Sequence, residues 1–497
     1  MPILMRMFNT ISIQKPHFQN LFVVMRINKN ATEIFPVASA VGVNWNAIHT
    51  SFMANMILSG SSVDACCPNP PLLATDLTVT NLHVSTFQKQ TILSYWNGFV
   101  TSGANFGHGY GNVTFLDTSY SEILTICPKL GLQTPDNVTY PCEADVHESH
   151  ITSHGGLLFT AYNVTQTDLS SIGGPKNGWV YDCLIYEINP VTGEILFQWS
   201  ALEYIPVNRT LMPLATGGQN RSIPLNYILI NSVIDVGDTY LINGRHTSTV
   251  YLVDKKNGNV LWSLNGETGG DFGPLSPDAK FSWQHHARAH NVTDTSMVIT
   301  LVNNAGSAFV KRTKSSNGLE IQLSLPPSKL QPVAILTALN NPNTSSSIIT
   351  NSQGSSLILS NGNYLLGYGQ IPVSREYGPN HGSNSDVLWE ARYGEDNLVQ
   401  NYRMFKQEWK ATPTRTTPSV FVEESGDGCY FAYVSWNGAT CIKAWDVYEG
   451  SERKMLEYVG RVEFKGFETR FIIGGPMVQV VAIMEDGKEY KSEIVTT

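Results

Sequence analysis

Short apolar runs alternate with turn residues along most of the chain. Residues 186–199 read YEINPVTGEILFQW and residues 251–264 read YLVDKKNGNVLWSL. In each, an apolar strand is followed by a turn containing glycine and then by a second strand with an aromatic residue. Residues 357–367 (LILSNGNYLLG) and 430–445 repeat the theme around an Asn-Gly pair. Asn-Gly favours a two-residue turn because both central positions need a positive φ. The pattern predicts four β-hairpins.

Hairpins of this kind extend from about residue 90 to residue 490, and few segments are patterned as helices. Repeated antiparallel sheets favour an all-β fold, a β-propeller, because radial blades leave only short strand edges exposed. A β-sandwich would need fewer strands. The spacing is irregular, so we expect insertions between blades, at residues 316–347 and 401–418, and additional short strands near the two ends.

The first part of the chain lacks this pattern. We therefore predict a poorly defined N-terminal segment over residues 1–85, either a leader or an erroneous start, with a short strand or two near Leu77 to Val84. The propeller would then occupy residues 86–497. Neither apolar run in this segment has the length and position of a signal peptide, so no clear signal sequence is visible.

Composition narrows the functional classes. The 497 residues carry a formal net charge of −9, and only 15% of them are charged. A nucleic-acid partner is not expected, because such proteins need a basic face to displace counterions from phosphates. A small anionic substrate stays possible, since one local arginine can outweigh the global charge. No stretch approaches the roughly 18 apolar residues of a membrane span.

Seven cysteines leave at least one unpaired. Cys127 and Cys142 are close enough to close a loop, and the spacing leaves both a disulfide and two free thiols open. The predicted 430–445 hairpin places Cys441 opposite Val434, so we do not expect Cys441 to pair with Cys429.

Eight N-x-S/T sequons indicate a secreted glycoprotein only weakly, because a chain this rich in Asn, Ser and Thr contains nearly as many by chance. They begin at Asn30, Asn112, Asn137, Asn163, Asn208, Asn220, Asn291 and Asn343.

Two histidine-rich stretches are candidates for chemistry. Residues 145–150 read DVHESH, and residues 282–290 read SWQHHARAH. HESH differs from the HExxH zinc motif, and on a strand His147 and His150 face opposite ways. We therefore expect no metal site here. Hydrogen-bonded histidines at strand ends are the plain structural alternative.

Arg245 is a third candidate, in the stretch NGRHT over residues 243–247. It closely follows a predicted strand and a turn, where a propeller presents loops to its axis. A guanidinium there can bind a planar or tetrahedral oxyanion, but an ion pair at the surface or between blades would also explain it. The Gly-rich stretch 107–112 lacks P-loop chemistry, and no dinucleotide-binding fingerprint occurs, so no cofactor is expected.

Taken together, these segments resemble the arylsulfotransferase family, its fungal branch especially. FSWQHHAR (281–288) resembles the signature in which a Trp-Gln-His triplet carries the nucleophilic histidine, and LINGRHTSTVYLVDKKNGNVLW (241–262) resembles the Arg-His-Thr strand. DVHESHIT and residues 173–206 match the stretch before it, while SWNGAT and NGNYLLGYG match later ones. The resemblance covers about residues 90–497.

The resemblance implies a six-bladed propeller with its active site at the central channel, in a secreted protein. It implies transfer of a sulfuryl group from a phenolic sulfate ester to a phenol acceptor, with no nucleotide donor. His285 would be the nucleophile and pass through a sulfohistidine, a step that a neutral imidazole can perform. The sulfuryl-binding and acid/base positions would fall to Arg245, Asn231 and His147. The further substrate-binding candidates are His286, His246 and Asn304.

The chain departs from the family pattern at important positions. Asn226 to Ser232 reads NYILINS, so Leu229 occupies the place of a functional histidine. His286 and Asn303 each replace an aspartate of the family. Two other classes of function follow from these departures: a catalytically degenerate propeller that serves as a binding or interaction module, and a propeller hydrolase that transfers the group to water.

Overall fold

The computed structural model describes most of the chain from residue 77 onward. The described residues are 24–27, 53–58, 77–100, 107–310, 315–330, 333–340, 347–379, 387–392, 396, 399–407, 409–425, 429–436, 438–466 and 468–496.

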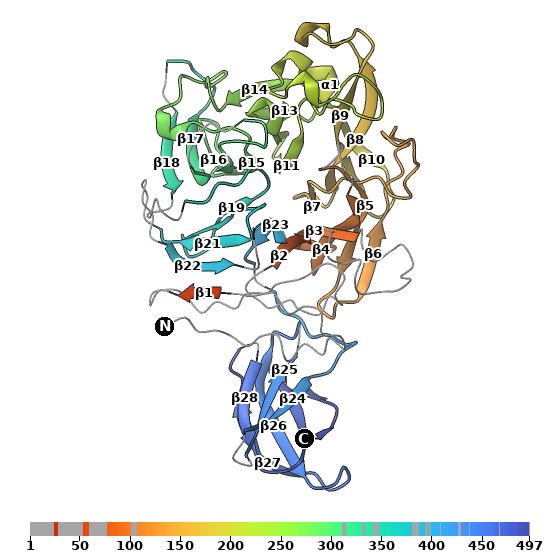
Figure 1. The fold of residues 1–497 in the computed structure, drawn as a ribbon, viewed down its shortest axis with the longest axis vertical. Helices are drawn as coiled ribbons and strands as arrows, with labels where there is room; N and C mark the ends of the chain where they lie inside the picture. Colours follow the sequence, from red (N-terminus) through yellow and green to blue (C-terminus); the bar gives the residue numbers. More distant parts are fainter. Residues whose placement is uncertain are drawn as a thin grey trace.

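The fold is nearly all β, and five antiparallel sheets, each containing four consecutive strands, follow one another around a central axis (Figure 1). The first comprises β3 (Leu77–Phe87), β4 (Gln90–Val100), β5 (Gly109–Leu116) and β6 (Glu122–Ile126). The second comprises β7 (Ser149–Ile151), β8 (Leu157–Thr167), β9 (Gly178–Ile188) and β10 (Ile195–Ser200). The third comprises β11 (Ile230–Val236), β12 (Thr239–Gly244), β13 (Thr249–Asp254) and β14 (Val260–Asn265). The fourth comprises β15 (His285–His290), β16 (Ser296–Asn303), β17 (Asn317–Ser324) and β18 (Ala334–Leu339). The fifth comprises β19 (Ser355–Ile358), β20 (Tyr364–Gly367), β21 (Val373–Tyr377) and β22 (Val387–Arg392).

A sixth position around the axis is taken by β23 (Val399–Phe405), which pairs with β2 (Met53–Leu58). The strand β1 (Val24–Ile27) adds to the outer edge of β22. The strands nearest the axis are β3, β7, β11, β15, β19 and β23, and β23 contacts β3, which closes the ring. This arrangement confirms the predicted all-β propeller class, while the number of blades stays a prediction.

Helices are short, as the sequence predicted. The one α-helix among the described residues is α1 (Ala201–Tyr204). The 3-10 turns are η2 (Ser170–Ile172), η3 (Val207–Arg209), η4 (Leu214–Thr216), η5 (Arg245–Thr247) and η6 (Pro277–Ala279). No helix in this described part of the chain is long and apolar enough to cross a membrane.

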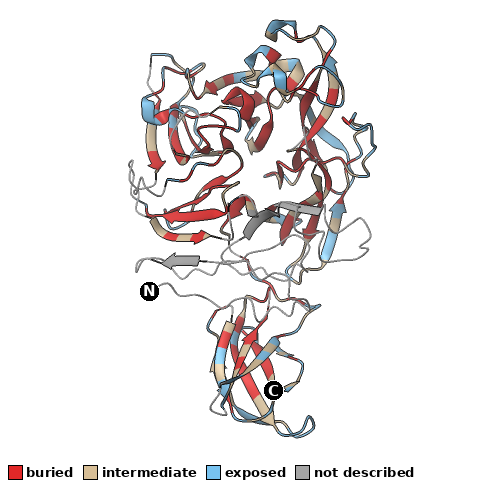
Figure 2. Cartoon of the chain, in the orientation of Figure 1, coloured by how far each residue is buried: buried red, intermediate tan, exposed pale blue. Residues whose placement is uncertain are grey.

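The hydrophobic core lies between consecutive sheets rather than at one centre, because each blade buries both of its faces against its neighbours. Middle strands such as β13 are therefore apolar and buried along almost their whole length, whereas outer strands such as β6 and β10 are largely exposed. Separate clusters fill the spaces from the first sheet to the fifth. In Figure 2 the buried residues accordingly lie mainly on the inner and middle strands of the sheets.

Three of the four predicted hairpins form, as the pairs β9–β10, β13–β14 and β19–β20. The fourth prediction was wrong. β25 (Cys429–Ser435) pairs with β24 (Ser419–Ser425) and β28 (Glu468–Ile473), not with β26 (Ile442–Gly450). The Asn-Gly signal there marks a passage from one sheet to another, so Val434 lies opposite Val420 and Thr469 rather than Cys441.

The two predicted insertions also proved to contain regular strands. Residues 316–347 supply β17 and β18, and residues 401–418 begin within β23. Most of the N-terminal segment 1–85 lies outside the described residues. The strand predicted near Leu77 to Val84 is confirmed as β3.

The C-terminal strands form two further sheets with their own hydrophobic cluster. One contains β24, β25 and β28, and the other contains β26, β27 (Glu457–Glu463), β29 (Met477–Met484), β30 (Glu489–Lys491) and β31 (Val495–Thr496). They lie beyond one side of the ring of sheets (Figure 1). The Tyr120 hydroxyl joins the two parts, since it donates a hydrogen bond to the Gly438 carbonyl (2.8 Å) and accepts one from the indole N–H of Trp409 (3.0 Å).

Cys127 and Cys142 form a disulfide, which settles the alternative that the sequence left open. It closes the loop between β6 and β7 at the surface. Cys183 and Cys441 are free thiols.

Candidate active site

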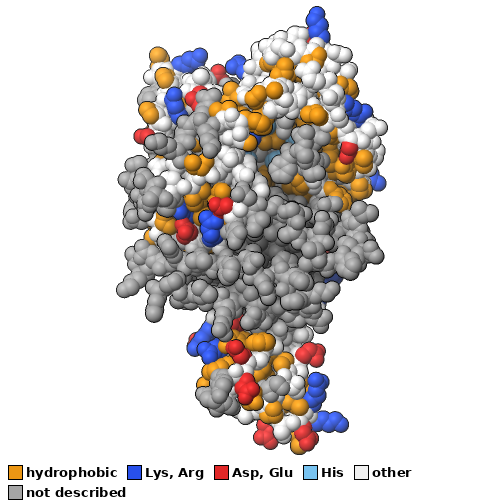
Figure 3. All heavy atoms as spheres, viewed as in Figure 1, with side chains coloured by type: hydrophobic (Ala, Val, Ile, Leu, Met, Phe, Trp, Pro, Cys, Tyr) orange, Lys and Arg blue, Asp and Glu red, His pale blue; other side chains and the backbone are white. Residues whose placement is uncertain are grey.

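A cavity of about 610 Å³ opens at the axis end of several sheets, and it collects most of the residues that the sequence singled out. Four histidines and one arginine line it: His108, His147, His246, His285 and Arg245. In Figure 3, hydrophobic side chains gather around a hollow in the upper half of the molecule, and histidine atoms are visible inside it.

His285 begins β15, where the backbone is irregular. A β-bulge lies between His285 and Arg288, and both Trp283 and His286 adopt left-handed backbone conformations, with φ of 55° and 56°. A bulge re-aims side chains, and non-glycine residues held at positive φ concentrate at functional sites. As a result the side chains of the two adjacent histidines point in different directions. His285 lines the cavity. His286 packs away from it against Phe405, and the centroids of the His286 and Phe405 rings are 5.9 Å apart.

Hydrogen bonds fix the tautomer of His285. Its Nε2 accepts a hydrogen bond from the backbone N–H of Gln353 (3.0 Å), so the ring proton must be on Nδ1. Nδ1 donates to Oδ1 of Asn304 (2.7 Å), and Nδ2 of Asn304 in turn donates to the Gln353 carbonyl (3.0 Å). Asn304 therefore positions His285, and the segment around Gln353 covers the nitrogen that would react.

The environment keeps His285 neutral. Burial lowers the pKa of its imidazole well below the usual value, and the nearby charge of Arg245 lowers it further, although the Asn304 hydrogen bond acts in the opposite direction. A neutral imidazole keeps the lone pair that a nucleophile needs.

Arg245 lies in η5, between β12 and β13, and only 8% of it is exposed. Its guanidinium donates to two neutral acceptors, Nε2 of His246 and the carbonyl of Asn351 (both 2.7 Å). It also lies over the Trp283 ring at 5.3 Å. No carboxylate of the described residues forms an ion pair with Arg245, and burial lowers its pKa to about 10.

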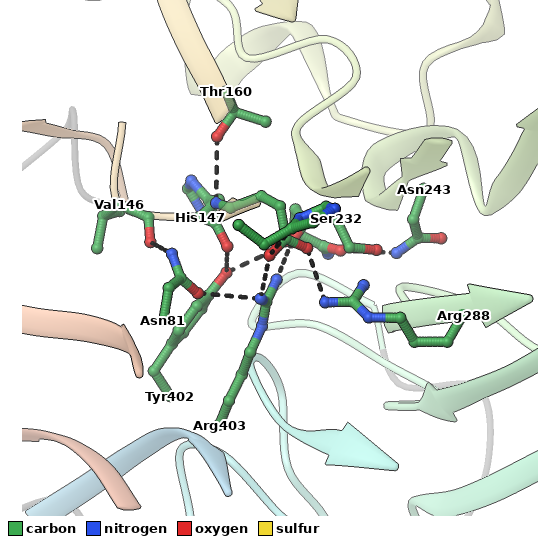
Figure 4. Close-up of polar contacts among 12 residues, drawn as sticks. Asn81, Val146, His147, Thr160, Ser232, Asn243, Arg288, Tyr402 and Arg403 are labelled. Atoms are coloured by element: carbon green, nitrogen blue, oxygen red, sulfur yellow. Dashed lines mark hydrogen bonds and ion pairs between the residues drawn. The ribbon is translucent and has the colours of Figure 1, made fainter. Parts of the chain in front are cut away.

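This lack of a counter-charge distinguishes Arg245 from Arg403, which is also buried, and from the partly buried Arg288. Arg288 and Arg403 both bind Glu148, which is completely buried, at 2.8 Å each. The three side chains form a network that joins β15, β23 and the residues before β7 (Figure 4). A buried charge is costly without a partner, so a lone guanidinium at a cavity wall is suited to an anion that arrives from outside.

His147 is held by Asp145. Its Nδ1 lies 2.6 Å from Oδ2 of Asp145, which leaves Nε2 as the free ring nitrogen. Asp145 also accepts hydrogen bonds from the N–H of Gly109, the N–H of His147 and the hydroxyl of Thr160. Burial acts to raise the pKa of Asp145, but His147 and these donors outweigh it, and the pKa lies below its usual value. An ionised carboxylate behind a histidine is the arrangement that stabilises an imidazolium during acid–base catalysis.

His108 is a cavity residue that the sequence analysis missed. It belongs to the Gly-rich stretch 107–112, where the search was for phosphate-binding loops. Its Nε2 lies 2.8 Å from Nδ2 of Asn226, its ring packs against Tyr162 and Tyr181, and burial lowers its pKa to about 3. A histidine between glycines was the available signal.

His108, Asp145 and His147 are also the described group whose donor atoms lie close enough to hold a metal ion, within 4.8 Å of one another. Both oxygens of Asp145 already accept hydrogen bonds from protein groups. A metal ion would therefore have to displace the contacts that hold His147.

Leu229, at the position of the family histidine, also lines the cavity. Its backbone is left-handed, with φ of 46°, and its carbonyl accepts the N–H of Arg245 (2.9 Å). The cavity thus has an apolar side chain on a segment that is hydrogen-bonded to the backbone of Arg245.

Asn231 lies behind the cavity, because it is not among the described lining residues. Its Nδ2 donates to the Gln284 carbonyl (2.9 Å), and its Oδ1 accepts from Nδ2 of Asn243 (2.7 Å). In this structure its side chain supports the strand that carries His285. Of the seven predicted site residues, His285, His147, Arg245 and His246 share the cavity, Asn304 holds His285, and Asn231 and His286 lie outside it.

A comparison with models of protein families shows to which family the chain belongs. Residues 83–394, which include all the cavity histidines, match the family model described as Arylsulfotransferase (ASST). The chain belongs to the arylsulfotransferase family. No curated protein matches it.

Several solved structures share a low level of similarity with the chain. An exo-beta-1,3-galactanase from Phanerochaete chrysosporium is 8% identical, with 86% of this chain and 94% of that chain covered and a TM-score of 0.31. A periplasmic gluconolactonase from Pseudomonas aeruginosa is 10% identical (84% and 97% covered, TM-score 0.28). A GH43 protein from Bacillus licheniformis is 9% identical (84% and 88% covered, TM-score 0.28).

Proposed function

We propose that this arylsulfotransferase-family protein transfers a sulfuryl group from a phenolic sulfate ester to a phenol through a sulfohistidine at His285, without a nucleotide donor. The observation that carries the proposal is the buried Arg245 guanidinium, which shares a cavity with a neutral histidine and has no carboxylate partner in the described part of the chain.

In the first half-reaction, the Nε2 lone pair of His285 attacks sulfur, and the bond from sulfur to the aryl oxygen breaks. The remaining N–H groups of Arg245 stabilise the charge on the sulfuryl oxygens. His147, with Asp145 behind it, donates a proton to the departing phenolate. In the second half-reaction, His147 takes the proton of the acceptor phenol, the acceptor oxygen attacks sulfur, and the bond to Nε2 breaks.

This mechanism requires one local change. The hydrogen bond from the Gln353 N–H occupies the Nε2 lone pair in the structure, so it has to break before sulfur can approach. Leu229 removes one acid/base group of the family pattern, which leaves His147 with both proton transfers.

The second candidate is a binding module that kept the fold and lost turnover. Two observations favour it: the leucine at position 229 and the covered lone pair of His285. A hydrolase is the third candidate, and the acceptor distinguishes it, because water would replace the phenol.

The deciding experiment is the intact mass of the protein after incubation with 4-nitrophenyl sulfate in the absence of acceptor, beside a His285→Ala control. We expect one sulfuryl adduct on the wild type, none on the control, and discharge of the adduct by added phenol. Discharge by water at the same rate indicates the hydrolase. A folded wild type with no adduct contradicts the covalent mechanism and favours the binding module, in which case Leu229→His tests whether labelling returns.

We also propose that the protein is secreted and glycosylated. The Cys127–Cys142 disulfide supports an oxidising compartment, and the sequon residues Asn137, Asn208 and Asn291 are exposed. A shift in gel mobility after treatment of the natural protein with a glycosidase specific for N-linked glycans tests this, and an unchanged mobility contradicts the glycosylation.

A further inference from the structure

We propose that the cavity selects a large aryl group, a fused system of two or more rings whose only charge is the sulfate, and that Leu229 sets this preference. The inference rests on the proposed function, since it names the substrate class of the same site. Size, charge and the position of Leu229 support it separately.

The size of the cavity exceeds the needs of a single ring. A volume of about 610 Å³ lies in the middle of the range that holds drug-sized ligands. A one-ring sulfate ester would leave much of the wall without contacts, and unfilled space forfeits dispersion energy. A fused aromatic system would fill it as a flat, rigid body.

The charge of the lining admits one anionic group. Arg245 is the one residue with a permanent charge among the described residues that line the cavity, and no carboxylate or lysine joins it there. Burial lowers the pKa of three lining histidines, His108, His246 and His285, which keeps them neutral near pH 7. A second anion on the ligand would lose its hydration and find no counter-charge.

The remaining wall combines polar side chains, such as those of Asn226 and Gln370, with a larger apolar part. The apolar part includes Val146, Met212, Pro224 and Phe309, together with the ring of Tyr402. Aromatic and aliphatic side chains of this kind favour an uncharged aryl body over a polar one.

Leu229 adds apolar surface to the cavity wall that carries Arg245. Its carbonyl accepts the N–H of Arg245, so its side chain starts beside the residue that would hold the sulfate. Its left-handed backbone, tied to Arg245, restricts the direction of that side chain. A large aryl group held by Arg245 would extend over Leu229, whereas a histidine there would present a polar edge. The departure that removes a proton-transfer group also provides a contact for a larger ring system.

The test uses aryl sulfonates. Their carbon–sulfur bond is not cleaved, so the sulfonate group cannot be transferred and binding is measured without reaction. The probes are benzenesulfonate, 2-naphthalenesulfonate and 1-pyrenesulfonate, with 1,3,6,8-pyrenetetrasulfonate as the multiply charged comparison. We expect affinity to rise about tenfold from each of the first three to the next, since each step buries roughly 50 Å² more apolar surface. The tetrasulfonate should bind at least about tenfold more weakly than the monosulfonate.

Variants then assign the preference. Leu229→Asn keeps a residue type that tolerates a left-handed backbone, and it should weaken pyrenesulfonate about tenfold while benzenesulfonate changes little. Leu196→Asn is the matched control, because Leu196 on β10 is 52% exposed and far from the lining, and it should leave the whole series unchanged. Arg245→Met should weaken all three monosulfonates.

The outcomes separate this inference from the proposed function. Equal affinities for the three monosulfonates, or an unchanged series in a folded Leu229→Asn variant, overturn the inference even if 4-nitrophenyl sulfate labels His285. Conversely, the expected affinity series without any labelling by 4-nitrophenyl or pyrenyl sulfate overturns sulfuryl transfer and leaves the selectivity in place.

Discussion

Glu148→Gln should destabilise the propeller more than any exposed charge substitution. The carboxylate is completely buried and holds Nη2 of Arg288 and Nη1 of Arg403, each at 2.8 Å. Those arginines belong to β15 and β23, while Glu148 directly precedes β7, so one side chain joins three sheets across the axis. Glutamine has nearly the same shape but no charge, and it leaves the buried Arg403 and the partly buried Arg288 without a counter-charge.

The magnitude follows from that imbalance. Removal of one partner from a buried ion pair costs about 3–5 kcal/mol, and two cations depend on this one carboxylate, so we expect about 5 kcal/mol. The free energy of unfolding of a domain is roughly 5–15 kcal/mol in total, so the variant would lose much of its stability. Equilibrium unfolding in guanidinium chloride, followed by tryptophan fluorescence, measures the loss as a lower midpoint.

The pH dependence gives an independent check. Burial acts to raise the pKa of Glu148, but Arg288 and Arg403 outweigh it and hold the pKa well below the ordinary value of 4.5. A depressed pKa contributes stability that is complete above the unfolded-state value and is lost as the pH falls through the folded-state value. The difference between wild type and variant should therefore be full at neutral pH and shrink progressively below about pH 4.5.

The matched control is Asp396→Asn, which removes the partner of Arg392 in an exposed pair of the same ring of sheets (2.5 Å). Such pairs contribute about 0–1 kcal/mol. If Glu148→Gln lowers the midpoint no more than Asp396→Asn does, the reasoning about the buried network is wrong.

Three further predictions concern the site and the surface loop. Asp145→Asn should slow sulfuryl transfer by about 100-fold or more while pyrenesulfonate binding stays unchanged, because the substitution removes the charge behind His147; equal rates in a quenched-flow assay contradict the role. Labelling of His285 should not decline as the pH falls from about 8 to 6, since its lowered pKa keeps the ring neutral there, and a decline centred on the ordinary value of 6.5 would refute this. Replacement of Cys127 and Cys142 by serine should cost about 3 kcal/mol of unfolding free energy, measurable by calorimetry, and an unchanged transition would show that the bridge does not stabilise the fold.

Much of the fold was predictable because local patterns determine it. Turns such as Asn361-Gly362 join neighbouring strands, and the short-range pairing of each blade follows from them. The signal failed near Gly438, where the partners of β25 are set by packing with β28, more than thirty residues further on. The sequence around Gly438 does not indicate that β25 pairs with β28.

The same distinction holds for the site. Arg245 and His285 could be identified from their own segments, because side-chain type carries the signal. Gln353 could not, since it reaches His285 through a backbone N–H that any residue but proline possesses. Asn231 was placed among the functional groups by motif alone, but its amide is fully engaged by Gln284 and Asn243.

The hydrogen bond between Gln353 and His285 also makes one amide proton a reporter. While Nε2 holds it, deuterium from solvent should replace this proton slowly, and a sulfuryl group on Nε2 would release it. Hydrogen exchange at a single backbone position would then follow the loading of the enzyme in real time, with no label on the substrate. A ligand that fills the cavity but leaves Nε2 untouched would keep the Gln353 amide protected, so occupancy and covalent loading would be read as two separate signals.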